Sequence, residues 1–166
     1  MMKRSVLSAV ALAVVSVALA VSGPSALADV HLPAVIDSNM VIQQEMPVHV
    51  WGWADAGEKV TVKLDDKSAA ATADGKGNWK VTFPAMKADG KTHSMTVAGK
   101  NTIKLDNILV GEVWVGSGQS NMEFRLAGAK GGAEAIAAAN CPQIRLLHVK
   151  KVQAGAPARD ITPQAR

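Results

Sequence analysis

The residues best suited to chemistry lie in one short stretch, residues 116–122, which read GSGQSNM. Its two glycines permit a tight turn and a close approach by a second reactant. A serine hydroxyl in such a turn becomes a nucleophile when a neighbouring base takes its proton. We therefore interpret Ser120 as a nucleophile. The turn that supports it consists of Gly118, Gln119 and Asn121.

Three better-known turns of similar composition do not fit this stretch. A dinucleotide-binding G-x-G-x-x-G would need a third glycine where Asn121 stands, and a phosphate-binding P-loop would need a Gly-Lys-Ser/Thr ending. The elbow G-x-S-x-G fails because Met122 occupies its last glycine position. A plain strand-to-helix connection, with Ser120 or Asn121 as helix N-cap, stays open as an alternative.

The elements around Ser120 predict the start of an α/β unit. Residues 108–115 are almost entirely apolar, which is typical of a strand buried on both faces of a parallel sheet. Residues 131–140 are rich in alanine and predict a helix, and residues 143–149 predict a second strand. One βαβ step cannot cover the faces of such a sheet, so residues 108–166 are expected to form an incomplete domain.

Residues 30–107 show a different pattern, with short strands between breaks rich in Gly, Pro and Asp. The expected strands cover residues 40–42, 48–53, 59–64, 79–83, 94–97 and 102–105. Strands at this spacing indicate an antiparallel β sandwich. Trp51, Trp53 and Trp79 could stack on a sugar ring, but we expect them in the core because an indole buries a large apolar area.

Residues 111–115 and 117–123 closely resemble the nucleophile block of bacterial sialate O-acetylesterases, a branch of the SGNH hydrolases. Six upstream segments look like the start of the same family's β domain; they are residues 32–36, 39–44, 46–48, 50–54, 57–62 and 99–103. The similarity covers nearly everything after about residue 30 in the family's order. Two departures, Gly116 in place of a frequent cysteine and Phe124-Arg125 in place of an aromatic-proline pair, put the substrate preference in doubt.

The resemblance implies a β sandwich followed by the truncated start of an SGNH, flavodoxin-like parallel-sheet hydrolase. It implies an exported serine esterase that removes O-acetyl groups from sialic acid or other acetylated carbohydrates through an acetyl-serine intermediate. The backbone N–H of Ser120 would form part of the oxyanion hole. The family's catalytic His and Asp lie in blocks absent from this chain, so the chain alone is expected to be inactive. A β-sandwich carbohydrate-binding or interaction module with a vestigial hydrolase segment is the alternative.

Residues 1–28 predict an export signal, with Lys3-Arg4, an apolar run over residues 6–21 and an Ala-x-Ala site at residues 26–28. The run is shorter than the roughly 20 residues that a membrane span needs, which disfavours a retained anchor. We therefore expect a periplasmic or extracellular protein without a membrane contact after cleavage.

Charge and residue spacing exclude several partners. The net charge is +4, and without the two basic residues of the signal it is 16 basic minus 14 acidic, or +2, which gives no case for nucleic acid. No histidine spacing suggests a metal, and no cofactor motif is present. His148 is disfavoured as a base for Ser120, and the single Cys141 is assigned to packing at a helix end. The oligomeric state stays open.

Overall fold

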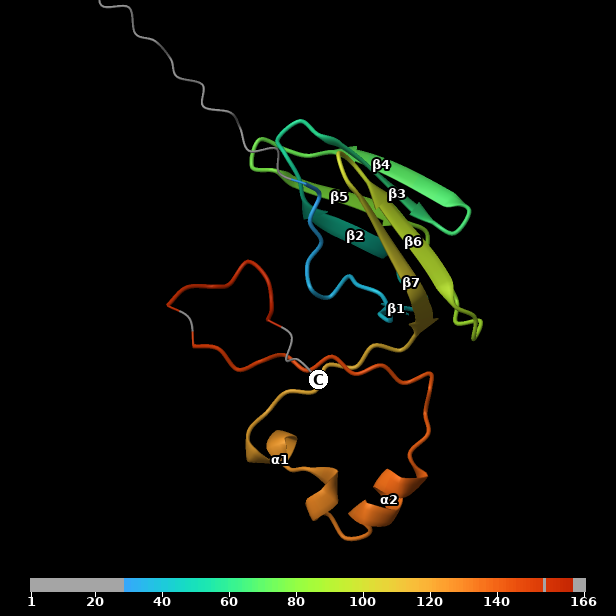
Figure 1. Cartoon of the computed structure of the whole chain (residues 1–166), viewed down its shortest axis with the longest axis vertical. Helices are drawn as coiled ribbons and strands as arrows, with labels where there is room; N and C mark the ends of the chain where they lie inside the picture. Colours follow the sequence, from blue (N-terminus) through green and yellow to red (C-terminus); the bar gives the residue numbers. More distant parts are fainter. Residues whose placement is uncertain (1–28, 154, 163–166) are drawn as a thin grey trace, which may run out of the picture.

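The computed structural model describes residues 29–153 and 155–162 (Figure 1). The predicted export signal, residues 1–28, lies outside the described residues. The elements in chain order are β1 (Val41–Gln43), β2 (Val48–Trp53), β3 (Lys59–Leu64), β4 (Lys67–Thr72), β5 (Asn78–Phe83), β6 (His93–Ala98), β7 (Thr102–Gly111), α1 (Ser120–Glu123), a 3₁₀ turn η1 (Leu126–Gly128) and α2 (Gly132–Ala138). Among these helices, none is long and apolar enough to cross a membrane.

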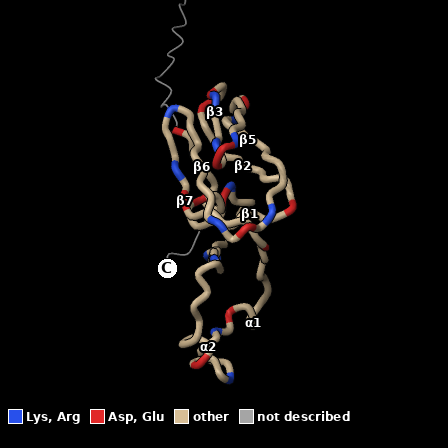
Figure 2. The backbone as a smooth tube through the Cα atoms, turned by 90° about the vertical axis from the view of Figure 1, so that its right-hand side faces the viewer, with Lys and Arg blue, Asp and Glu red and all other residues tan. Residues whose placement is uncertain are grey.

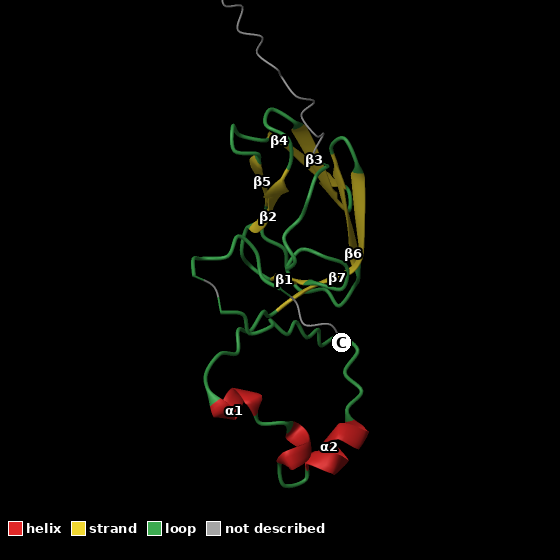
Figure 3. Cartoon of the chain, turned by 60° about the vertical axis from the view of Figure 1, so that its left-hand side comes forward, coloured by secondary structure: helices red, strands yellow, loops and turns green. Residues whose placement is uncertain are grey.

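Two sheets make up the β part. The larger sheet has the strand order β1-β7-β6-β3-β4; β1 runs parallel to β7 and the other pairs are antiparallel. The smaller sheet is the antiparallel pair β2 and β5. Figure 3 shows the curled larger sheet on one side of the smaller one, with the helices at the far end of the molecule. The expected antiparallel β sandwich is confirmed only in part: the fold is mostly β, but its larger sheet is mixed because β1 runs parallel to β7.

The core between the sheets follows from alternation along the strands. In β3, Val60, Val62 and Leu64 point inward and are fully buried, whereas the lysines of the same strand face water. In β5, Trp79, Val81 and Phe83 alternate in the same way with exposed polar residues. Side chains of successive strand residues leave on opposite faces, so this pattern assigns one face of each strand to the core.

The tryptophans do not share one environment. Trp79 is 3% exposed, which confirms its expected place in the core. A Cβ atom on Gly52, its partner across β2 and β5, would lie 2.9 Å from the Trp79 ring and 2.2 Å from the carbonyl oxygen of His31. Glycine is therefore required at position 52 for the indole to lie across β2. The prediction is wrong for Trp51, which is 40% exposed on the opposite face.

The predicted α/β start is not formed by the described residues. The apolar run at residues 108–111 belongs to β7, where Leu109 and Val110 pair with β1. Residues 112–118 are in no strand, and neither are residues 143–148, so both strand predictions are wrong there. The predicted helix is confirmed over Gly132–Ala138. A strand needs a neighbour for its backbone, and no described strand lies beside these segments.

Candidate functional site

Ser120 is the first residue of α1 and is exposed to solvent. We expected a strand over residues 108–115 to lead into its turn, and this is wrong beyond Gly111 because residues 112–118 form no strand. The N-cap position belongs to Gln119, whose side chain makes no capping hydrogen bond, so the N-cap alternative for Ser120 or Asn121 is wrong as well. The Met122 amide donates to the Gln119 carbonyl over 3.0 Å, which closes the single helical turn.

The Met122 side chain lies close to both glycines of the turn. A Cβ atom on Gly118 would lie 2.8 Å from Cγ of Met122, and one on Gly116 would lie 2.9 Å from its Cε. The Met122 side chain therefore folds back over both glycines. Ser120 is exposed beside this turn and is open to a second reactant.

A polar cluster fixes the chain where it leaves β7 toward Ser120. We call it the Glu112 clamp, and it consists of Gln43, Gln44 and Glu112. The Gln43 side-chain amide donates to Glu112 Oε2 over 3.1 Å, and that of Gln44 donates to Oε1 over 2.7 Å. The Val113 amide donates in turn to Gln43 Oε1 over 2.8 Å. Two successive glutamines at the end of β1 thus hold both the side chain and the backbone of the outgoing segment.

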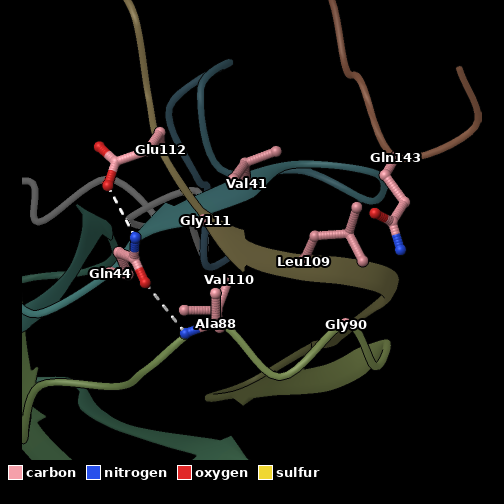
Figure 4. Close-up of a pocket in the computed structure, with 9 residues that line it drawn as sticks. All are labelled: Val41, Gln44, Ala88, Gly90, Leu109, Val110, Gly111, Glu112 and Gln143. Atoms are coloured by element: carbon pink, nitrogen blue, oxygen red, sulfur yellow. Dashed lines mark hydrogen bonds between the residues drawn. The ribbon is translucent and has the colours of Figure 1, made fainter.

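The same cluster bounds a shallow pocket of about 340 Å³ (Figure 4). Gln44 lies between Glu112 and the loop before β6, where its oxygen accepts from the Ala88 amide over 3.3 Å. Leu109 and Val41 form the apolar side of the pocket, and Gln143 reaches its rim. Ser120 does not line this pocket, so the described geometry joins no nucleophile to it.

The hydrogen bonds of the Glu112 clamp should depend on pH. Hydrogen bonds from the amides of Gln44 and then Gln43 hold the pKa of Glu112 below its usual range. The clamp is therefore complete above the ordinary pKa of a glutamate, about 4.3, and is lost as the pH falls through the lower folded value. In an NMR titration we expect the Val113 amide and the Gln43 and Gln44 side-chain amides to shift together in that acidic range.

Glu112→Gln should remove this common transition, because the residue then cannot ionise. Glu134→Gln, which changes an exposed acid of α2, should leave it intact. A Val113 amide that titrates in Glu112→Gln as it does in the unchanged protein would contradict the assignment.

The described residues do not assemble a catalytic base beside Ser120. His49 Nδ1 lies 3.0 Å from Thr82 Oγ1, and His93 contacts Asp65 and Asp89 at 2.7 and 3.3 Å. His148 is exposed, and no hydrogen bond in residues 29–153 or 155–162 joins it to Ser120. In the same part of the chain no three His, Cys, Asp or Glu residues are grouped as a metal site.

Two smaller expectations can also be compared with the structure. Cys141 is exposed and lies three residues beyond the end of α2 at Ala138, so the packing role given to it is wrong. Figure 2 shows basic and acidic residues interspersed along the chain of the β part. This mixture agrees with the low net charge.

Comparisons with known proteins place these features in a family context. No family model matches the chain. The sialate O-acetylesterase of Mus musculus is 28% identical over 139 residues, which are 76% of this chain and 26% of that protein. The one of Rattus norvegicus is 34% identical over 100 residues, which are 54% of this chain and 18% of that protein.

A solved structure agrees with these relatives. The crystal structure of a carbohydrate acetylesterase from Xanthomonas citri matches with a TM-score of 0.76 and 37% identity, over 81% of this chain and 31% of that one. The chain is a distant homologue of the sialate O-acetylesterases. The resemblance seen in the sequence is thereby confirmed. This sialate O-acetylesterase homologue spans about a quarter of the length of its mouse relative.

The Glu112 clamp was missed by the sequence analysis. Residues 39–44 and 111–115 were recognised only as family-like segments, and no role was given to their polar side chains. The available signal was the pair of adjacent glutamines at the end of a short apolar strand. Its partner acid is almost 70 positions away, and only the parallel pairing of β1 with β7 brings them together.

Proposed function

We propose that this chain carries the nucleophile segment and the β domain of an exported carbohydrate O-acetylesterase. The observation that carries the proposal is the 37% identity and the TM-score of 0.76 shared with the carbohydrate acetylesterase from Xanthomonas citri. The exposed Ser120 at the start of α1, close to Gly116 and Gly118, supports it. The substrates are O-acetylated saccharides, sialic acids among them, and the site of action is the periplasm or the exterior of the cell.

The reaction is acyl transfer in two steps. Ser120 Oγ attacks the acetyl carbonyl while a base takes its proton, and the tetrahedral oxyanion is held by the Ser120 backbone N–H and further donors. The alcohol of the sugar leaves with a proton, and an acetyl-serine is formed. Water then attacks this ester with help from the same base and releases acetate. Since no described residue is joined to Ser120 as this base, the proposal assigns the role to the family's His and Asp blocks, which this sequence lacks, or to another chain.

The proposal is tested with the protein purified from its native host. We expect release of free acetate from O-acetylated N-acetylneuraminic acid or from an O-acetylated neutral sugar, followed by NMR. The N-acetyl group of the first substrate is an internal control, because an amide is much less reactive than an ester and should stay intact. Cleavage of an aryl acetate without acetate release from either sugar would contradict a carbohydrate esterase, and no cleavage of any ester would contradict an esterase altogether.

A further inference from the structure

The outer face of the small sheet carries an aromatic surface that the core does not use. Side chains of His49, Trp51 and Trp53 leave β2 on the face opposite the buried Val48 and Val50. Their partners on β5 are also exposed; they are Thr82, Lys80 and Asn78. We call these six residues the Trp51 face. Its centre is an indole that is 40% exposed although it lies in the middle of a regular strand.

The backbone beside Trp51 also has free hydrogen-bonding groups. Trp53 exchanges two hydrogen bonds with His31 on the side of β2 that faces away from β5, at 2.8 and 2.9 Å. Alternate residues of a strand direct their N–H and C=O groups to the same side. The N–H and C=O groups of Trp51 and His49 therefore point to this open edge, where no described strand pairs with β2.

A small hollow lies along this edge. It has a volume of about 250 Å³ and reaches from the edge of β2 toward the core. Its lining on the β2 side is Pro47, Val48, His49, Val50 and Trp51, and on the other side Val35, Ile36, residues 40–43 and the buried Met95. An apolar ring face next to main-chain donors and acceptors matches the two kinds of surface on a sugar, whose C–H groups and hydroxyls lie on different sides of the ring. The hollow has room for about one such ring, not for a long chain.

The charge of the face favours an anion. None of its six residues is acidic, and Lys80 lies directly across from Trp51. Arg159 adds a second positive charge, because its guanidinium lies over the Trp53 ring at 4.5 Å and donates to Asn78 Oδ1. Asp74 approaches the Trp53 end, where the backbone and side-chain amides of Asn78 hold its carboxylate.

We propose that the Trp51 face binds a saccharide that carries a carboxylate. The sugar ring stacks on the Trp51 indole, its hydroxyls bond to the free edge of β2, and its carboxylate pairs with Lys80. A peptide strand added to β2 is the competing occupant, but His31 already occupies the edge at Trp53 and leaves only about three residues for a ladder. The inference goes beyond the proposed esterase, since it requires neither Ser120 nor hydrolysis.

The test is a binding titration of the full chain by NMR with the methyl glycoside of N-acetylneuraminic acid, which has no O-acetyl group to lose. We expect saturable shifts of the Trp51 indole N–H and the His49 amide, and none at the Trp114 indole. The methyl ester of the same sugar lacks the charge and should bind about two- to fivefold more weakly, the range of an exposed ion pair.

Matched variants separate the contribution of the Trp51 ring to binding from that of the Lys80 charge. Trp51→Ala should abolish binding, and Trp51→Phe should keep part of it, whereas Trp114→Ala should bind normally. Lys80→Gln should remove the difference between acid and ester, and Lys63→Gln, an exposed lysine on β3, should preserve it. These positions are exposed, so the variants are expected to fold.

Three results would overturn the inference. The first is an absence of shifts at Trp51 up to the solubility limit of the sugar. The second is equal binding of acid and ester in the unchanged protein, which would remove the role of the carboxylate. The third is an extended peptide that shifts the β2 amides where the saccharide does not, which would assign the edge to strand addition. None of them bears on ester cleavage, which is measured separately with O-acetylated substrates.

Discussion

Replacing Ser120 by alanine should lower the kcat of ester cleavage by at least about 10⁴-fold in the protein expressed from its native gene. The acetyl-serine path depends on one oxygen atom, and an alanine leaves only the background attack by water. Alanine keeps the backbone N–H at position 120, so the oxyanion contact is the same in both proteins. The loss of rate therefore measures the side-chain oxygen alone. The measurement is the rate of acetate release from an aryl acetate and from an O-acetylated sugar.

Ser117→Ala is the matched control for this experiment. Ser117 is exposed in the same turn, two residues before Gln119, and the reaction gives it no role. We expect its activity to stay within about threefold of the unchanged protein, the range of ordinary surface substitutions. A serine-reactive organophosphate should add one adduct at position 120 of the unchanged protein and none in Ser120→Ala. Equal activities of the two variants would show that Ser120 is not the nucleophile.

The strands of the β part could be predicted from sequence because their burial pattern is local. Alternation of valines and lysines over residues 59–64 fixes both the strand and its buried face, and the structure has β3 at the same bounds. β4 was missed because its sequence, KSAAAT, has no large apolar residue. It forms because β3 offers a free edge after the turn at Asp65, and this depends on the neighbouring strand rather than on propensity.

The candidate site was harder to predict because it depends on partners far along the chain. An apolar run such as residues 108–115 indicates burial but not where its neighbour is. Its first half pairs with β1, while Trp114 and Val115 contact little and are 89% and 91% exposed. Trp51 shows the opposite error: its position in mid-strand predicted a core residue, although the strand has one outer face and Trp51 lies on it.

The last prediction concerns the segment that carries Ser120. Twelve large apolar side chains between residues 113 and 152 are exposed by 45% or more; they are Val113, Trp114, Val115, Met122, Phe124, Leu126, Ile136, Ile144, Leu146, Leu147, Val149 and Val152. Limited chymotrypsin digestion of the mature chain should therefore cut first after Trp114 or Phe124. It should leave a resistant product that contains β1 to β7.

The expected contrast in rate is large. A protease needs a stretch of backbone that is not held in a helix or strand. Residues 112–118 are in neither, whereas a cut inside the β part requires strands to separate. With a typical global stability of 5–15 kcal/mol for a domain, strand opening should slow cleavage there by at least about 10³-fold. Mass spectrometry of the products over time measures both rates and tests the division between the β part and the segment after Gly111.

Trp51 provides an internal control for the cause of this contrast. Its indole is 40% exposed, but its backbone is part of β2, which is paired with β5 along its whole length. If side-chain exposure alone decided the cleavage site, Trp51 would be cut at a rate comparable with Trp114. If freedom of the backbone decides, Trp51 should survive together with the buried Trp79. Early cleavage after Trp51 would mean that the small sheet opens as easily as the Ser120 segment, and the β part would then not be an independently stable unit.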